Sequence, residues 1–275
     1  MVAAGTYWVP TLELWQGVGP GTLVSYGGCG IVIQRHDGCL MNGNVEVGYY
    51  LSRKDELMQG LIESAQEWLP VLAERHGNDG AGRLLQETRR RFEALIPKLP
   101  DIGGDENHLT ASLIGSARCL ALYLAVKASG GTAQDAGKLL YDAMVRSAPD
   151  APIPPSQRLS REELMQRRRE RAEWSQQRRY PEDWMYAFVE GDGLEFDYGY
   201  DFCQCATERL YRAQGALGFL PFYCFLDFPQ CEKGGLGLAR AKTLAEGDEV
   251  CDFRFTEGGK ASQHWPPPFV AKGKR

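Results

Sequence analysis

Apolar residues recur every three or four positions along four stretches of the first half of the chain, as they do in helices with one buried face. These stretches run from residue 52 to the region of residue 70, from about 80 to 96, from 109 to about 129 and from 132 to about 147. The third stretch is the most apolar and is expected to lie centrally. Ser52 and Thr132 are each followed three residues later by an aspartate, which predicts capping boxes at two helix starts.

A Pro-rich segment without apolar periodicity, residues 149–155, predicts a linker after the fourth helix. Residues 158–179 then carry eight arginines against four acidic residues. We interpret this segment as a solvated, partly charge-paired helix, because charged side chains are mostly exposed. An anion-binding or nucleic-acid-binding patch is the alternative interpretation.

After Pro181 the pattern becomes that of strands. Two runs rich in aromatic and apolar residues, 184–189 and 194–202, flank the turn residues 191–193, which predicts a β-hairpin. The remaining expected elements are a helix at about 203–217 and two short paired strands at 241–245 and 250–256.

Helices come first and strands follow, an order that predicts an α+β fold rather than a doubly wound sheet. The helical N-terminal region is expected to pack on a C-terminal antiparallel sheet that has helices of its own. The expected divisions are a Gly-rich arm with short strands at 1–50, a helical region at 51–150, a linker and Arg-rich helix at 151–180, a cysteine-containing catalytic region at 181–258 and a mobile tail at 259–275.

Charge and hydropathy exclude several classes of protein. The net charge is −5, from 31 basic and 36 acidic side chains, whereas general nucleic-acid binders are usually basic. No stretch reaches the roughly 18 uninterrupted apolar residues that span a bilayer, and residues 1–10 do not resemble a secretory signal. We therefore expect a cytoplasmic protein that acts on a small-molecule substrate, with neither a nucleic acid nor a membrane as partner. A homo-oligomer stays open.

The chain has eight cysteines, and no two of them form a Cys-x-x-Cys pair. In a cytoplasmic chain of this length they are expected to be free thiols rather than disulfides. The four histidines are scattered, and the motifs of nucleotide binding, serine hydrolysis and zinc proteolysis are absent. We therefore expect neither a metal nor another cofactor.

The reactive side chains concentrate in residues 198–255, which hold five of the eight cysteines. Cys224 and Asp227 are three residues apart, so one helical turn would place the thiol and the carboxylate on the same side. A thiolate is a strong nucleophile, and a neighbouring carboxylate can move its proton or hold a cationic substrate. The carboxylate alone raises the thiol pKa, so a cation from the substrate or the protein is also needed. The alternative is that Cys224 is a small buried apolar residue.

Two further cysteines are candidates for the same site. Cys205 is expected near the start of a helix, where unpaired amides favour a thiolate. In the last predicted strand Cys251 shares one face with Phe253, and Arg254 lies on the other face. Cys251 is therefore either a core residue or a residue that lines an apolar-walled pocket.

Three blocks of this region resemble the L-2-amino-thiazoline-4-carboxylic acid hydrolase family. They are residues 197–205 (DYGYDFCQC), Cys224 with Asp227, and residues 243–255 (TLAEGDEVCDFRF), of which the last is the most specific. The similarity covers roughly residues 50–255.

The resemblance implies a hydrolase that opens a thiazoline or amidine-like ring by cysteine-assisted chemistry and, from the namesake substrate, gives a carbamoyl-cysteine. The functional candidates on this chain are Cys205, Cys224 and Asp227 as catalytic residues, with Cys251 lining the pocket. Candidates for binding a substrate carboxylate or amine are Arg254, Glu106 and Asn107.

Three alternatives stay open. The last block is faintly similar to vinyl-reductase-type small-molecule-binding domains, which implies a binding or sensing module without turnover. Cys205, Cys224 and Cys251 are also candidates for a thiolate–metal centre. Lyase chemistry with cysteines and one aspartate, as in organomercurial lyases, or cyclase chemistry is the third alternative.

Overall fold

The computed structural model describes residues 48–147 and 159–271. The predicted arm at 1–50, apart from its last three residues, lies outside the described residues. So do the Pro-rich linker and the last four residues of the predicted tail.

The first half is helical, as the apolar periodicity predicts. Its helices are α1 (Tyr49–Ser52), α2 (Lys54–Leu95), α3 (Thr110–Ala128) and α4 (Ala133–Arg146), with 3-10 turns η1 (Ile96–Lys98) and η2 (Gly104–Glu106). The backbone of α2 is interrupted at Gly77, whose φ of 67° lies in the left-handed region that glycine tolerates. The long helix is thus two helices meeting near residue 77, which confirms the predicted separation before residue 80.

The two predicted capping boxes have different outcomes. Thr132 and Asp135 form the capping box at the start of α4, with both reciprocal hydrogen bonds present. The prediction for Ser52 is wrong, because its hydroxyl donates to the Tyr49 carbonyl at 2.8 Å and Arg53 occupies the N-cap of α2.

The second half combines helices with one sheet. The helices are α5 (Arg161–Gln176), α6 (Ala206–Ala213), α7 (Leu220–Phe225), α8 (Asp227–Lys233) and α9 (Pro268–Ala271), with the 3-10 turn η4 (Leu244–Glu246). The strands are β1 (Met185–Glu190), β2 (Tyr198–Gln204), β3 (Leu236–Ala239) and β4 (Cys251–Glu257). They form an antiparallel sheet in the order β1-β2-β4-β3, and the chain has the predicted α+β fold.

The partner of the last strand differs from the prediction. Residues 241–245 were expected to be that strand, but residues 236–239 form it instead. The amides of Ala241 and Lys242 donate to Asp252 Oδ1 at 2.9 and 2.6 Å, so this carboxylate satisfies two groups that a strand would have paired. Residues 241–243 therefore form a loop that leads into η4 instead of a strand.

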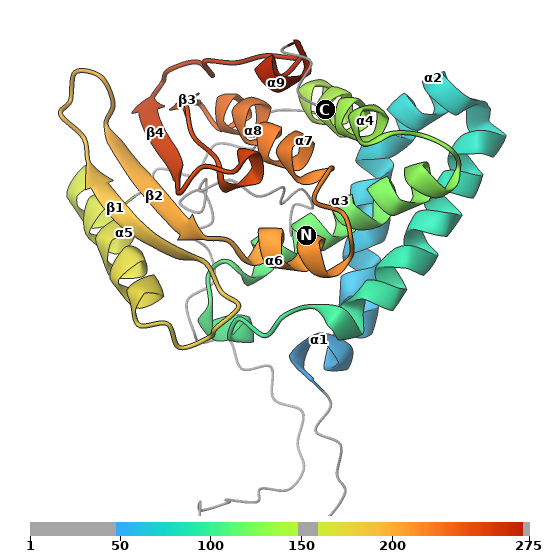
Figure 1. Cartoon of the computed structure of the whole chain (residues 1–275), viewed down its shortest axis with the longest axis horizontal. Helices are drawn as coiled ribbons and strands as arrows, with labels where there is room; N and C mark the ends of the chain where they lie inside the picture. Colours follow the sequence, from blue (N-terminus) through green and yellow to red (C-terminus); the bar gives the residue numbers. More distant parts are fainter. Residues whose placement is uncertain (1–47, 148–158, 272–275) are drawn as a thin grey trace, which may run out of the picture.

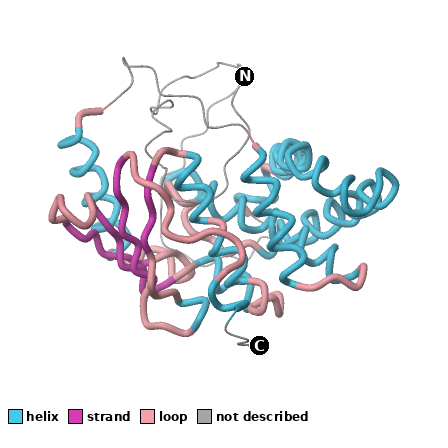
Figure 2. The backbone as a smooth tube through the Cα atoms, turned by 90° about the horizontal axis from the view of Figure 1, so that it is seen from above, coloured by secondary structure: helices cyan, strands magenta, loops and turns pink. Residues whose placement is uncertain are grey.

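The elements share one hydrophobic core. In Figure 1 the sheet and α5 form the left side, α2, α3 and α4 form the right side, and α6, α7 and α8 lie between them. The view from above separates the strands from the α2–α4 region in the same way (Figure 2). Helix α3 contacts α2, α4 and α6. It is long and apolar enough to span a membrane, but 67% of it is buried in the protein, as in a core helix.

Residues 259–271 of the predicted tail lie on the body of the protein. The Trp265 ring contacts Tyr141 and Phe222 with centroids 5.5 and 6.2 Å away, and Phe269 is 7% exposed and contacts Phe222 at 5.1 Å. The buried Phe269 and the half-buried Trp265 hold the segment against α4 and α7.

Candidate functional site

The elements of the second half bring three cysteines and one aspartate into electrostatic reach of one another. Cys205 lies just after β2, Cys224 on α7, Asp227 at the start of α8, and Cys251 at the start of β4. Each of the thiol groups feels the charge of at least one of the others. The four residues that the sequence singled out for chemistry thus lie on elements that contact one another, since β2 pairs with β4 and α7 contacts α8.

A buried ion pair lies at the base of this cluster. Asp227 Oδ2 accepts a hydrogen bond from Arg240 Nη1, and the two side chains are only 2% and 5% exposed. Arg240 Nη2 also donates to the Cys224 carbonyl at 2.9 Å. The guanidinium lies over the rings of Phe228 and Phe253, 5.2 and 4.9 Å from their centroids. Arg240 is therefore fixed by hydrogen bonds and by aromatic faces, and it fixes Asp227 in turn.

Burial sets the protonation of Cys224 and Asp227. It raises the pKa of the half-buried Cys224 thiol well above its ordinary value, with Asp227 adding to the rise and Arg240 opposing it. It also raises the pKa of Asp227 to about 7, again against the influence of Arg240. The Cys224 thiol is thus protonated at rest. The pKa of Asp227 lies close to neutral pH, so its carboxyl group can both accept and donate a proton there.

Cys205 is the N-cap of α6, with amide groups directed at its sulfur. The backbone N–H of Glu208 donates to Cys205 Sγ at 3.4 Å, and the nearby amide of Thr207 and indole of Trp184 also lower the pKa of the thiol. Burial raises the pKa of Cys205 to about 12, while these donors lower it. The arrangement would stabilise a negative charge at this position once one forms.

Cys251 is held by the loop that the most specific sequence block encodes. Its sulfur accepts the Leu244 N–H at 3.2 Å and lies 3.7 Å from Thr243 Oγ1. The Thr243 hydroxyl accepts the Ala245 N–H at 3.1 Å, and Asp248 Oδ2 accepts the Thr243 N–H at 2.8 Å. Residues 243–248 thus form a turn closed by their own side chains, with the Cys251 thiol beneath it.

The structure does not bring Arg254 to the thiols. Its side chain lies on the face of β4 opposite to Cys251, where it donates to Asp201 at 2.8 Å and lies over the Phe196 ring. The predicted role in substrate binding therefore has no support in the geometry, because alternate strand residues point to opposite faces.

The polar segment before α3 also has other partners. Asn107 is 3% exposed and bonds to the Ile102 carbonyl at 2.7 Å and to the Leu109 amide at 2.8 Å. Glu106 is exposed and accepts a hydrogen bond from the Tyr180 hydroxyl at 3.4 Å. These contacts fold the segment itself and leave both predicted substrate-binding residues outside the thiol cluster.

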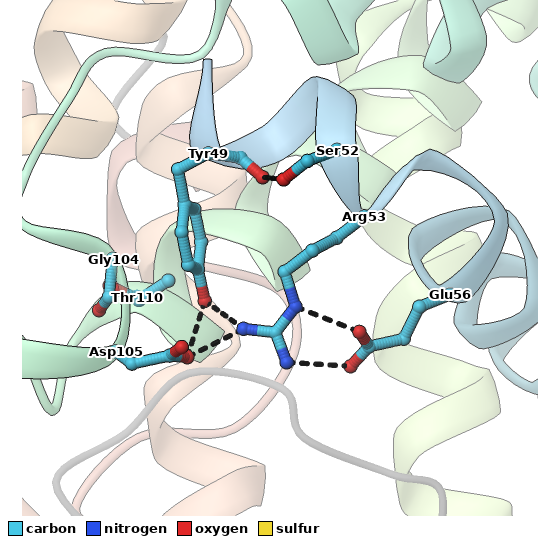
Figure 3. Close-up of polar contacts among 7 residues, drawn as sticks. All are labelled: Tyr49, Ser52, Arg53, Glu56, Gly104, Asp105 and Thr110. Carbon is cyan, nitrogen blue, oxygen red and sulfur yellow. Dashed lines mark hydrogen bonds and ion pairs between the residues drawn. The ribbon is translucent and has the colours of Figure 1, made fainter. Parts of the chain in front are cut away.

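Figure 3 shows what holds this segment against the start of the chain's helical part. The Tyr49 hydroxyl and Arg53 Nη1 both donate hydrogen bonds to Asp105 Oδ1, at 2.6 and 2.5 Å. Arg53 Nε also donates to Glu56 at 2.8 Å. Thr110 closes the turn from within by donating to the Gly104 carbonyl at 2.6 Å. The network ties α1 to η2, and we assign it a structural role.

Among residues 48–147 and 159–271, no three His, Cys, Asp or Glu side chains are grouped closely enough to hold a metal ion.

Sequence reasoning missed Arg240. The required cation was recognised, but spacing along the chain gave no reason to place a residue 13 positions after Asp227 beside it. The signal was a lone arginine at the end of a short apolar run, at a position that proves to be 9% exposed. A charged residue in an apolar context calls for a buried counter-charge, and Asp227 supplies one.

Comparison with known proteins assigns the family. The model of the family described as L-2-amino-thiazoline-4-carboxylic acid hydrolase matches residues 112–255, and the chain belongs to this family. The match includes all three thiols of the cluster, Asp227 and Arg240. No curated protein and no solved structure matches the chain.

Proposed function

We propose that this protein is a hydrolase that opens a small thiazoline or amidine-like ring, with Cys224 as the nucleophile. The single observation that carries the proposal is the contact of Asp227 with the buried Arg240, one helical turn from Cys224. The family name, which describes hydrolysis of L-2-amino-thiazoline-4-carboxylic acid, supports the reaction class and supplies the first substrate to test.

In the proposed reaction Cys224 Sγ adds to the ring carbon that carries the exocyclic nitrogen, and its proton passes to Asp227. The bond from that carbon to a ring heteroatom breaks, and the released heteroatom takes the proton. Water then adds to the carbon, giving one proton to Asp227. The bond to Sγ breaks, the sulfur recovers that proton, and a carbamoyl group is left on the product.

The charges around the cluster fit these steps. Arg240 lowers the pKa of Cys224 and holds Asp227 in place, so it is a positioning residue for the proton transfer. A protonated amidine entering the site would add a second positive charge beside the thiol and favour the thiolate further. The N–H groups around Cys205 and Cys251 would stabilise negative charge on those sulfurs at the edges of the site.

The proposal is tested by incubating the protein with L-2-amino-thiazoline-4-carboxylic acid and following carbamoyl-cysteine by mass spectrometry. We expect turnover by the wild type and a loss of roughly 100-fold or more in Cys224→Ser. Cys203→Ser is the matched control, because Cys203 is exposed and its thiol donates to the Met185 carbonyl away from the cluster. If Cys224→Ser keeps more than about a tenth of wild-type turnover, the nucleophile assignment is wrong.

The same experiment decides the alternative of a binding or sensing module. Tight binding of the thiazoline by the wild type without any conversion would support such a module and refute the hydrolase. Conversion that continues unchanged after metal removal would exclude the thiolate–metal alternative.

A further inference from the structure

A buried hydroxyl beside the thiol cluster has no hydrogen-bond partner. Tyr223, on α7, is 5% exposed, and among the described part of the chain no group accepts from or donates to its hydroxyl oxygen. Buried polar groups are nearly always paired in folded proteins, because desolvation without a replacement partner is unfavourable. An orphaned hydroxyl at this depth therefore requires an explanation.

The surroundings of Tyr223 are those of the proposed site. It directly precedes Cys224 in the sequence. It also lies four residues before Asp227, and along a helix this spacing places the side chains of Tyr223 and Asp227 on the same face. Burial raises the pKa of the phenol well above its ordinary value, and the nearby Cys119 of α3, Asp227, Cys224 and Cys205 add to the rise. Tyr223 therefore stays protonated, and its hydroxyl is an unused hydrogen-bond donor on the same helix as Cys224.

A neighbouring tyrosine shows that the fold can satisfy such a group. The Tyr211 ring lies 5.5 Å from the Tyr223 ring, and Tyr211 is fully buried. Its hydroxyl donates to the Ser116 carbonyl at 3.0 Å. Two adjacent buried tyrosines thus differ in one respect: Tyr211 has an internal acceptor and Tyr223 has none within the described residues.

We propose that the Tyr223 hydroxyl is kept unpaired in order to donate a hydrogen bond to the bound substrate, at a heteroatom attached to the carbon that Cys224 attacks. This inference rests on the proposed function and adds a substrate-contacting residue to it. A fixed donor at that position stabilises negative charge that develops on the heteroatom, and it costs no reorganisation during the reaction. It also selects rings that carry an acceptor there over carbocyclic analogues.

The experiment compares Tyr223→Phe with Tyr211→Phe, which removes the same atom from a hydroxyl that already has a partner. Thermal unfolding and turnover of L-2-amino-thiazoline-4-carboxylic acid are measured for both variants and for the wild type. We expect Tyr223→Phe to unfold at the wild-type temperature or above it and to lose roughly tenfold or more in kcat/KM. We expect Tyr211→Phe to unfold at a lower temperature and to keep kcat/KM within about twofold.

Two results would overturn the inference while leaving the proposed function intact. One is wild-type turnover in Tyr223→Phe while Cys224→Ser is inactive. The other is a fall in unfolding temperature in Tyr223→Phe that equals the fall in Tyr211→Phe, since the hydroxyl would then have an internal partner. If the wild type neither converts nor binds the thiazoline, the proposed function fails and this inference fails with it.

Discussion

Replacing Arg240 by methionine is the perturbation that tests the buried ion pair most sharply. Methionine keeps an unbranched side chain of similar reach in the space over Phe228 and Phe253, but it removes the charge and both hydrogen bonds. The carboxyl of Asp227 then stays behind at 2% exposure without its cation. We expect the variant to fold less stably and to lose turnover.

The magnitude follows from the burial of both partners. Removing one member of a buried ion pair typically costs about 3–5 kcal/mol, and less where the remaining carboxyl can take up a proton. Arg254→Met is the matched control, because the pair of Arg254 and Asp201 has side-chain exposures of 26% and 37%. A partly exposed pair of this kind contributes about 0–1 kcal/mol. The same type of substitution should thus differ several-fold in its cost between the two sites.

The pH dependence gives a second, independent magnitude. Burial places the folded-state pKa of Asp227 near 7, above that of the unfolded chain, so its contribution to stability is lost as pH rises from about 4 to about 7. Arg240 lowers this pKa, and without it the loss continues above pH 7. One pKa unit corresponds to about 1.4 kcal/mol, so the deficit of Arg240→Met should grow between pH 7 and pH 8 by at most about that amount.

Urea unfolding followed by tryptophan fluorescence measures these free energies, since Trp68 and Trp184 are buried and report on both halves. The wild type, Arg240→Met and Arg254→Met would be compared at pH 7 and pH 8. Equal costs for the two substitutions, or a deficit in Arg240→Met that does not change with pH, would refute the account of the ion pair.

Two further predictions concern groups next to the site. Thr243→Val removes the hydroxyl that accepts the Ala245 amide, and we expect a loss of about 1 kcal/mol in urea unfolding together with slower turnover; unchanged stability would show that the turn does not depend on this bond. Burial raises the pKa of Asp183 to about 6, so its contribution to stability is lost as pH rises from about 4 to about 6. Asp183→Asn should therefore flatten the fall in unfolding temperature across that range, and an undiminished fall would contradict the assignment.

The helical part of the fold was predictable because the information is local. Stripe periodicity locates α3 and α4 to within a residue or two, and Thr132 with Asp135 marks the start of α4. The loop at 241–243, in the segment 241–245 where we expected a strand, was not predictable. The amides of Ala241 and Lys242 donate to the carboxylate of Asp252, which lies about ten positions further along the chain. The alternation of apolar and polar residues in a short segment does not reveal a distant side chain that takes the hydrogen bonds of its backbone.

The candidate site was predictable where one helical turn determines the geometry. Cys224 and Asp227 follow from spacing alone, whereas their contact with Arg240 depends on how β3 packs against α8. Arg254 was assigned to the substrate although its own alternation with Cys251 placed it on the other face of β4. Resemblance between sequences named the right segment there but not the direction in which each side chain points.

The central claim, that thiols from separate segments line one site that a small substrate enters, is tested most directly by alkylation in the presence of the thiazoline. The protein would be treated with iodoacetamide with and without L-2-amino-thiazoline-4-carboxylic acid, and modification of each cysteine would be followed by peptide mass spectrometry. The account predicts that Cys205 and Cys224, both half-buried, are protected together by the thiazoline while the exposed Cys203 is not. Equal modification of Cys224 with and without the thiazoline, or protection of Cys203 alone, would contradict it.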